Sequence, residues 1–154
     1  MPFSTLGLST PLVQAITELG YQTPTPIQEQ AIPAILSGKD LIATAQTGTG
    51  KTAAFALPTS QRIDVTKHHP QVLVLAPTRE LALQVAKACD TYGRQIPGLR
   101  VASVLGGVPY GAQLKALRSP LDILVATPGR LLDHHQQGTL DLSKVEIFVL
   151  DEAD

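Results

Sequence analysis

The stretch Leu41–Leu57, "LIATAQTGTGKTAAFAL", leads from a short apolar run through a glycine-containing loop into a helical pattern. An apolar strand, such a loop, Gly-Lys-Thr and a helix in this order are typical of a phosphate-binding loop. Gly48 and Gly50 let the backbone bend, so that successive N–H groups and the helix N-terminus point at an anion. We therefore expect Lys51 to reach the β- and γ-phosphates of a nucleotide and the Thr52 hydroxyl to ligate Mg²⁺. The alternative is a glycine-rich turn without a ligand.

An acidic pair follows another apolar run, "IFVL" at 147–150. Asp151 comes directly after this run, which is the Walker-B arrangement, and it is expected to hold Mg²⁺. Glu152 is next along the chain and can position and polarise the attacking water. Two acidic residues by themselves would rather end a strand in solvent, but the phosphate-binding loop upstream favours the catalytic interpretation.

Five short apolar runs predict the fold. They are continuous rather than alternating, as expected for strands that are buried on both faces of a parallel sheet. Helical patterns separate them, so we expect an α/β fold in which helices flank an open parallel sheet with right-handed crossovers. Ligands bind beyond the carboxyl ends of the strands in such sheets. The runs lie at 41–45, 72–76, 101–105, 123–126 and 147–150.

Two helical patterns precede the first of these runs. Thr10 is the expected N-cap of the first helix and Gly20 its stop, and Thr25 and Gly38 take the same roles in the second. Pro33 is expected to kink or split the second helix, because proline lacks the N–H that a helix interior needs.

The composition is that of an ordinary globular domain. Hydrophobic residues make up 44% of the 154 residues, no apolar run reaches the length of a membrane span, and the N-terminus lacks a secretory pattern. The single cysteine, Cys89, falls on the apolar face of a helical pattern at 79–92, so we interpret it as a core residue in a cytoplasmic protein. The formal net charge is −1, so a nucleic-acid partner would need a local cationic patch.

The four histidines occur as two adjacent pairs, His68-His69 and His134-His135. Neither pair has cysteine or acidic partners at a spacing typical of a metal site. We therefore expect both pairs to lie on solvated loop or helix surface.

Two strand ends resemble each other. The stretches "VLVLAPTR" (72–79) and "ILVATPGR" (123–130) each run from an apolar strand through a Thr/Pro turn to an arginine. Thr78 and Thr127 are good N-caps, and Pro128 suits the first position of a helix. Each arginine is therefore expected in the first turn of a helix.

Cations are disfavoured in that first turn, because the helix dipole is positive there. Arg79 and Arg130 therefore favour phosphates from outside, which a nucleic-acid backbone would supply. Gly106-Gly107 follows a further strand and would allow a close backbone approach. A salt bridge from Arg79 to a carboxylate such as Glu80, and a plain turn at the glycines, are the alternatives.

Gln28 has two interpretations. With Thr25 it fits the capping box S/T-x-x-E/Q, in which its side chain closes the start of a helix. A glutamine amide can also pair with the N6/N7 edge of adenine. The local pattern does not separate the two.

Taken together, these motifs resemble the N-terminal RecA-like domain of DEAD-box RNA helicases, over the whole chain. Phe3 and "GYQTPTPIQ" (20–28) look like the Q motif, with Gln28 on adenine and Phe3 or Tyr21 packed on the base. The sequence as a whole suggests a bacterial member of the family, similar to the RhlE-like subgroup. The other motifs in chain order are "AQTGTGKT" (45–52), "PTRELA" (77–82), Gly106-Gly107, "TPGR" (127–130) and "DEAD" (151–154).

The resemblance implies an ATP- and Mg²⁺-dependent enzyme that binds RNA across two RecA-like domains and separates strands locally, with weak sequence preference. It implies nucleotide contacts from Phe3, Tyr21, Thr23, Gln28, Ala45, Gln46, Thr47, Gly48, Thr49, Gly50, Lys51 and Thr52. It implies RNA contacts from Pro77, Thr78, Arg79, Gly106, Gly107, Thr127, Pro128, Gly129 and Arg130.

Members of this family continue past the DEAD motif with a helix, a further strand and a second domain. We therefore expect residues 1–32 to form a Q-motif helical region and residues 33–154 a partial RecA-like domain. The chain alone is expected to have negligible RNA-dependent ATPase and unwinding activity, and to self-associate through a gap in its sheet. A P-loop ATPase of another class, or a nucleotide- or RNA-binding module without turnover, is the alternative.

Overall fold

The computed structural model of this chain describes residues 2–38 and 51–150. They fold into two compact units, whose division differs from the predicted boundary between residues 1–32 and 33–154. The predicted boundary was drawn from the positions of sequence motifs and not from contacts between residues, and it stays a prediction. The first unit takes in the chain up to Arg62 and Ala88–Pro97, and the second takes in Ile63–Lys87 and the chain from Gly98 onward.

The first unit is helical. Helices α2 and α3 pack against each other, and the unit buries large apolar side chains such as Leu12, Ile32 and Leu57 completely. The predicted stops at Gly20 and Gly38 are confirmed, since both follow a helix with a positive φ that glycine adopts readily. The elements of this unit are the 3₁₀ turn η1 (Phe3–Thr5), α1 (Thr10–Glu18), α2 (Pro26–Leu36), α3 (Lys51–Gln61) and the 3₁₀ turn η2 (Gly93–Gln95).

Helix α1 begins one residue earlier than predicted. Its N-cap is Ser9 rather than Thr10, which is the first helical residue. The Ser9 N–H donates to Gln61 Oε1 at 2.6 Å, and Gln61 Nε2 donates to the Gly7 carbonyl at 3.0 Å. The side chain at the end of α3 therefore fixes the chain entering α1, and no local sequence pattern contains that information.

Pro33 does not split α2, so this part of the prediction is wrong. The helix runs unbroken through Pro33, and the Ser37 N–H continues the ladder by donating to the Pro33 carbonyl at 3.1 Å. Proline removes only its own donor, and the fully buried Ile32 holds the surrounding turn in place. Thr25 is the N-cap, as predicted.

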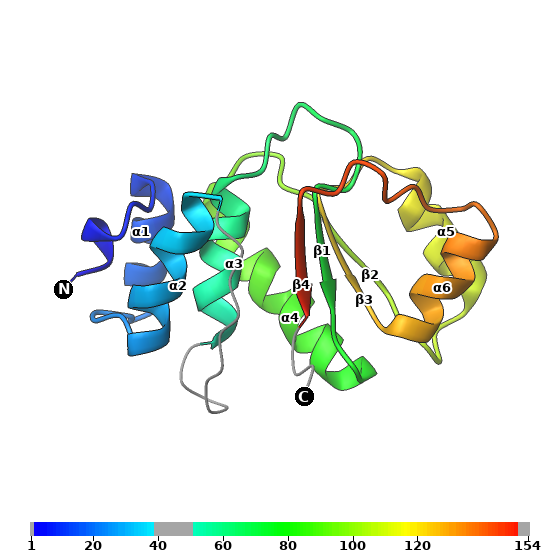
Figure 1. Cartoon of the computed structure of the whole chain (residues 1–154), viewed down its shortest axis with the longest axis horizontal. Coiled ribbons are helices and arrows are strands. Elements are labelled where there is room, and N and C mark those ends of the chain that lie inside the picture. The colour runs from blue at the N-terminus through cyan, green and yellow to red at the C-terminus, as the bar shows by residue number, and fades with distance from the viewer. Residues whose placement is uncertain (1, 39–50, 151–154) are drawn as a thin grey trace. The chain divides into compact units, whose positions relative to one another are not determined.

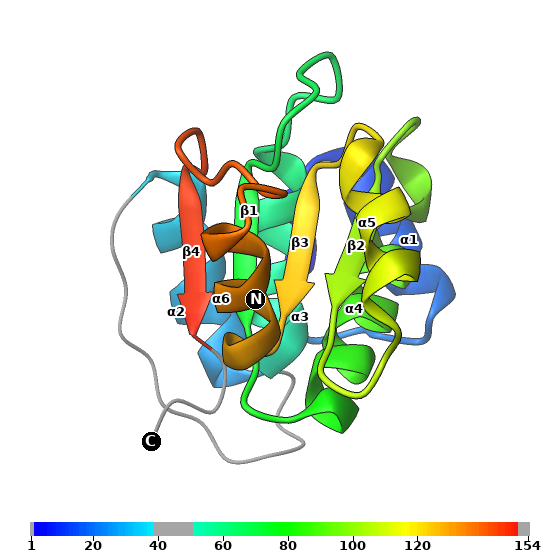
Figure 2. The same ribbon diagram turned by 90° about the vertical axis from the view of Figure 1, so that its right-hand side faces the viewer.

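The second unit is built on a parallel four-stranded sheet in the order β2-β3-β1-β4. All arrowheads point to the same end of the sheet (Figure 2), which confirms the predicted α/β class. The predicted strand at 41–45 lies outside the described residues. The strands are β1 (Val72–Leu75), β2 (Val101–Val104), β3 (Ile123–Ala126) and β4 (Ile147–Leu150).

Helices α5 (Tyr110–Arg118) and α6 (Pro128–Gln136) cover one face of this sheet (Figure 1). Leu124 of the central strand β3 packs there with Leu131 of α6. Val125, which points to the opposite face, is equally inaccessible to solvent. Strand β3 is thus buried on both faces, which is why its sequence shows no polar alternation.

Helix α4 (Arg79–Tyr92) matches the predicted range of 79–92. Its buried stripe includes Val85 and Cys89. Burial raises the pKa of the Cys89 thiol to about 12, so the thiol stays protonated. Cys89 is a core residue, as its pattern indicated.

Strand β4 is the last strand of the sheet that the described residues form. Phe148 and Leu150 on this strand are 54% and 57% exposed. Such exposure is unusual in a parallel sheet, where both faces are normally covered.

Candidate nucleotide and nucleic-acid sites

Three loops of the second unit meet at the carboxyl edge of the sheet. They follow β1, β2 and β3, which are neighbours in the sheet, and they carry all the residues predicted to contact RNA. Helix α4 starts in the first loop and α6 in the third. The topology therefore brings together residues that are far apart in the sequence, at the edge where ligands of open α/β sheets bind.

A side-chain hydrogen bond links the second and third loops. The Gly106 N–H donates to Thr127 Oγ1 at 3.1 Å. Thr127 occupies the predicted N-cap position of α6 with Pro128 following it, but its side chain caps no N–H of that helix. Thr78 does cap its helix, because the Leu81 N–H donates to Thr78 Oγ1 at 3.2 Å.

Close packing links the second loop to the first. Gly107 has a φ of +80°, and a Cβ built there would lie 3.3 Å from Arg79 Nη1. A side chain would therefore be strained by the backbone conformation and crowded by the guanidinium. The glycine lets the loop backbone approach Arg79, and contact of Gly106-Gly107 with a phosphate stays a prediction.

The two arginines that were predicted to bind phosphate differ in exposure and in their hydrogen bonds. Arg79 is exposed, and its guanidinium makes no hydrogen bond or ion pair with any residue in the described ranges, Glu80 included. Arg130 is half-buried, and its Nη1 donates to the Val108 carbonyl at 2.7 Å and to Gln113 Oε1 at 3.0 Å. Arg79 is thus available to an external anion, whereas Arg130 holds the loop after β2.

His134 is fully buried, so the prediction that it lies on solvated surface is wrong. Its Nε2 lies 3.2 Å from Gln113 Oε1 and its Nδ1 lies 2.9 Å from Thr139 Oγ1. Burial, and then the charge of Arg130, lower the pKa of His134. His134 follows Leu131 by three residues on the buried stripe of α6, and this helical spacing was the signal to notice.

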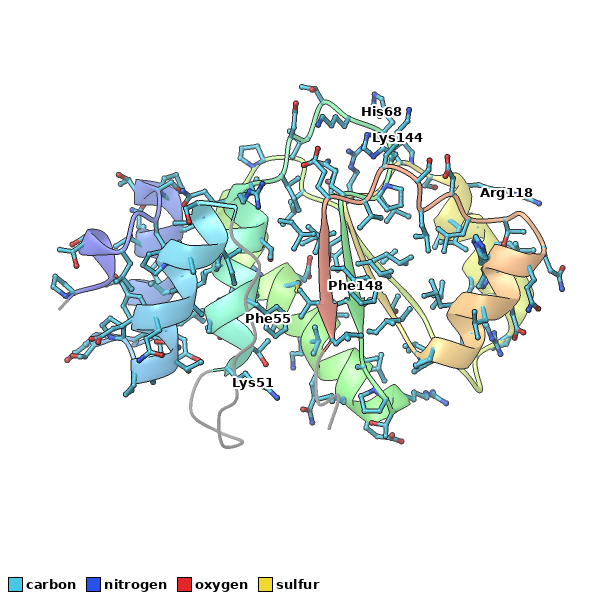
Figure 3. The ribbon with its side chains drawn as sticks, in the orientation of Figure 1. Lys51, Phe55, His68, Arg118, Lys144 and Phe148 are labelled. Atoms are coloured by element: carbon cyan, nitrogen blue, oxygen red, sulfur yellow. The ribbon has the colours of Figure 1, made fainter. Side chains whose placement is uncertain are left out.

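The remaining histidines lie in polar segments. His68, in the loop before β1 (Figure 3), and His135 are exposed, and His69 is partly so. Within residues 2–38 and 51–150, no group of three or more His, Cys, Asp or Glu side chains could hold a metal ion.

No helix in the described part of the chain, residues 2–38 and 51–150, is both long and apolar enough to cross a membrane.

The described nucleotide-site residues belong to the first unit. Helix α3 begins at Lys51 and continues with Thr52 (Figure 3), so the N–H groups of its first turn and a lysine are placed together. This donor set fits a polyphosphate, and the Thr52 hydroxyl is a ligand type that Mg²⁺ accepts. The predicted site residues Ala45, Gln46, Thr47, Gly48, Thr49, Gly50, Asp151 and Glu152 lie outside the described residues.

Gln28 forms the capping box that its spacing indicated. The Thr25 N–H donates to Gln28 Oε1 at 2.9 Å, and the Gln28 N–H donates to Thr25 Oγ1 at 3.4 Å. Gln28 is buried. The structural interpretation is therefore confirmed, and contact with adenine stays a prediction.

The aromatic candidates differ in exposure. The Phe3 ring is buried in η1, whereas Tyr21 is 42% exposed. The Tyr21 hydroxyl lies 3.2 Å from the Tyr92 hydroxyl, and Thr23 is exposed nearby in the chain. Of the two rings, Tyr21 offers the larger open surface to a base.

Comparison with known families decides the class. The model of the DEAD/DEAH box helicase family matches residues 25–154, which is most of the chain. The chain belongs to the DEAD/DEAH box helicase family.

Curated DEAD-box relatives match almost the whole chain. Proteins named ATP-dependent RNA helicase DeaD from Klebsiella pneumoniae and Escherichia coli are 54% and 53% identical to it over 99% of its residues. A protein of the same name from Mycobacterium tuberculosis is 51% identical. The chain spans 24% of the length of the first two and 27% of the third. The RhlE-like subgroup stays a prediction.

Solved DEAD-box structures share the fold. A crystal structure of a DEAD box protein from Methanococcus jannaschii matches with a TM-score of 0.94 at 41% identity. It covers all of this chain, which in turn covers 42% of that protein. A hypothetical ATP-dependent RNA helicase from Sulfolobus tokodaii matches 96% of the chain with a TM-score of 0.85 and 42% identity. These matches confirm the predicted RecA-like fold.

Proposed function

We propose that this chain supplies the nucleotide-binding and RNA-binding residues of a cytoplasmic, ATP-dependent RNA helicase. The observation that carries the RNA part is the exposed Arg79 beside Gly107, at an edge where three loops and two helix N-termini converge. Backbone N–H groups, helix N-termini and an exposed guanidinium recognise phosphate but no particular base. The substrate class that fits is therefore a nucleic-acid backbone, and we take it to be single-stranded RNA because the relatives are named RNA helicases.

The nucleotide part rests on the start of α3. Lys51 would bind the β- and γ-phosphates of ATP, and the Thr52 hydroxyl would hold Mg²⁺ together with Asp151. Mg²⁺ would neutralise charge on the phosphates, and Glu152 would position the attacking water. Gln28 and Tyr21 would recognise adenine. In the whole protein, a second RecA-like domain would complete the RNA and nucleotide sites.

Removing the exposed arginine tests the RNA site. Arg79→Ala is expected to weaken the binding of a fluorescent single-stranded RNA about fivefold to tenfold, because one phosphate contact is lost. The slope of log K against log salt should fall by about 0.7, which is the value for one phosphate of a single strand. Fluorescence anisotropy at several salt concentrations measures both quantities.

The matched control is Arg118→Ala. Arg118 is exposed at the last residue of α5 (Figure 3), so this variant removes the same charge away from the carboxyl edge. It should leave affinity and salt slope close to wild type. Equal losses in the two variants would mean that overall charge, not this edge, binds RNA. Competition by single-stranded DNA of the same sequence tests the alternative, a P-loop ATPase of another class. An RNA helicase should prefer RNA, whereas equal competition by DNA would favour the alternative.

We also propose that the chain self-associates through β4. Exposed strand edges and apolar side chains recruit further strands, and β4 carries both among the described residues. Sedimentation velocity should show concentration-dependent association, which Phe148→Lys abolishes. Leu132→Lys is the control, because Leu132 is a similarly exposed leucine on α6. A wild-type monomer at every concentration would disprove this.

A further inference from the structure

A buried glutamine lies behind the proposed RNA-binding loops. Gln113 is on α5 and is only 4% exposed. Its Nε2 donates to the Leu105 carbonyl at 2.8 Å, while its Oε1 lies 3.0 Å from Arg130 Nη1 and 3.2 Å from His134 Nε2. One amide therefore connects Leu105, the residue after β2, to two side chains of α6.

The orientation of this amide is fixed by its partners. The Leu105 carbonyl can only accept, and the Arg130 guanidinium can only donate, so the amide nitrogen must face the first and the oxygen the second. Because the oxygen accepts, His134 must carry a proton on Nε2. In the neutral ring, which burial favours, the unprotonated Nδ1 then lies 2.9 Å from Thr139 Oγ1, and the Thr139 hydroxyl is also within 3.0 Å of the His134 carbonyl oxygen, to which it donates.

This network ends on the loop after β2. Arg130 Nη1 bonds the Val108 carbonyl as well as Gln113, and the Gly106 N–H bonds Thr127. The loop backbone is therefore held at three positions, residues 105, 106 and 108, from α5 and from the start of α6. Gly107 lies between these anchors, beside Arg79.

We propose that Gln113 and His134 are positioning residues for RNA binding. Neither touches the RNA, since both are buried; they act by fixing Arg130 and the Gly106–Val108 backbone in the shape that phosphate needs. This inference rests on the proposed RNA binding at the carboxyl edge. Preorganised donors bind more tightly than mobile ones, because less conformational entropy is lost on binding.

Two substitutions at His134 separate positioning from mere stability. His134→Leu keeps a side chain of similar volume but removes both ring nitrogens. His134→Gln can still present an amide N–H to Gln113 Oε1. His134→Leu should weaken RNA binding about fivefold to tenfold, on the order of one hydrogen bond between neutral groups. His134→Gln should restore most of the affinity. Wild-type affinity in folded His134→Leu would overturn the inference, and so would an equal loss in both variants.

A second pair of variants tests the glutamine. Gln113→Leu should weaken RNA binding about tenfold, on the scale of one hydrogen bond to a charged group. It should also speed hydrogen exchange at the Gly106 N–H while the amides of β3 stay protected. Gln136→Leu makes the same chemical change at an exposed position of α6 and should alter neither. If Gln113→Leu does not fold, the His134 pair alone decides.

The outcomes distinguish the two proposals. A wild-type chain that binds no RNA at low salt would overturn both the proposed function and this inference. Normal wild-type binding, with unchanged RNA affinity and unchanged Gly106 exchange in the folded variants, would overturn the positioning role alone. A nitrogen-15 spectrum that shows His134 protonated on Nδ1 instead of Nε2 would also contradict it, without any RNA present.

Discussion

Replacing Asp122 by alanine is expected to lower the free energy of unfolding by about 3–5 kcal/mol, the scale measured when one partner of a buried ion pair is removed. Asp122 is completely buried at the amino end of β3. Its carboxylate accepts from the Arg100 N–H at 2.9 Å, from Arg100 Nε at 3.1 Å and from Arg100 Nη2 at 2.9 Å. Gln71 Nε2 lies 3.3 Å from the same group.

The loss should be large because several donors lose their acceptor together. Arg100 also donates through Nη2 to the carbonyls of Val65 and Lys67, at 3.2 and 2.7 Å, so the same side chain holds the loop before β1. In Asp122→Ala the arginine keeps these carbonyl bonds but loses its counter-charge. Gln71 Nε2 keeps its bond to the Asp64 carbonyl at 2.9 Å but loses its second acceptor in a buried site.

Urea unfolding followed by far-ultraviolet circular dichroism measures this change, since the chain has no tryptophan to report it. Asp141→Ala is the matched control. Asp141 is an exposed loop aspartate whose carboxylate accepts from the Ser143 N–H, so its loss should lower the free energy of unfolding far less than the loss of Asp122. A loss below about 1 kcal/mol in Asp122→Ala would show that the Arg100 network contributes little to the free energy of unfolding.

The sheet could be predicted from the sequence because strands that are buried on both faces are continuous apolar runs. Val72–Leu75 and Ile123–Ala126 are uninterrupted apolar runs, and a parallel strand between helices has that signature. Gly20 and Gly38 ended their helices as predicted for the same reason, since a positive φ depends on the residue itself.

Features set by tertiary partners could not be predicted. Arg79 and Arg130 follow similar Thr/Pro turns, yet only Arg130 meets a carbonyl and a buried glutamine from other elements. The surface prediction for His134 rested on the lack of cysteine or acidic partners at a metal-site spacing, whereas its helical spacing from Leu131 turns its side chain inward. Gln113 of α5 contacts both Arg130 and His134, and no local sequence pattern indicates these contacts.

Lys51→Ala is expected to weaken the binding of Mg-ATP by about 10–100-fold, the range of one or two hydrogen bonds from a charged group. The first turn of α3 starts at Lys51, so its ammonium and the helix N-terminus act on the same anion. Isothermal titration calorimetry with the 154-residue chain measures the change. Lys144→Ala removes an equal charge from an exposed loop (Figure 3) and should bind as wild type does.

The choice of ligand tests which part of the nucleotide Lys51 contacts. If the ammonium reaches the β- and γ-phosphates, Lys51→Ala should lose affinity for ATP but hardly any for AMP. An equal loss for both ligands would place the lysine elsewhere or indicate a misfolded α3.

Recognition of the base is tested separately by Gln28→Glu, which keeps an acceptor for the Thr25 N–H and so preserves the capping box. It should reduce the preference for ATP over GTP without removing phosphate binding, because the amide that would pair with adenine is gone.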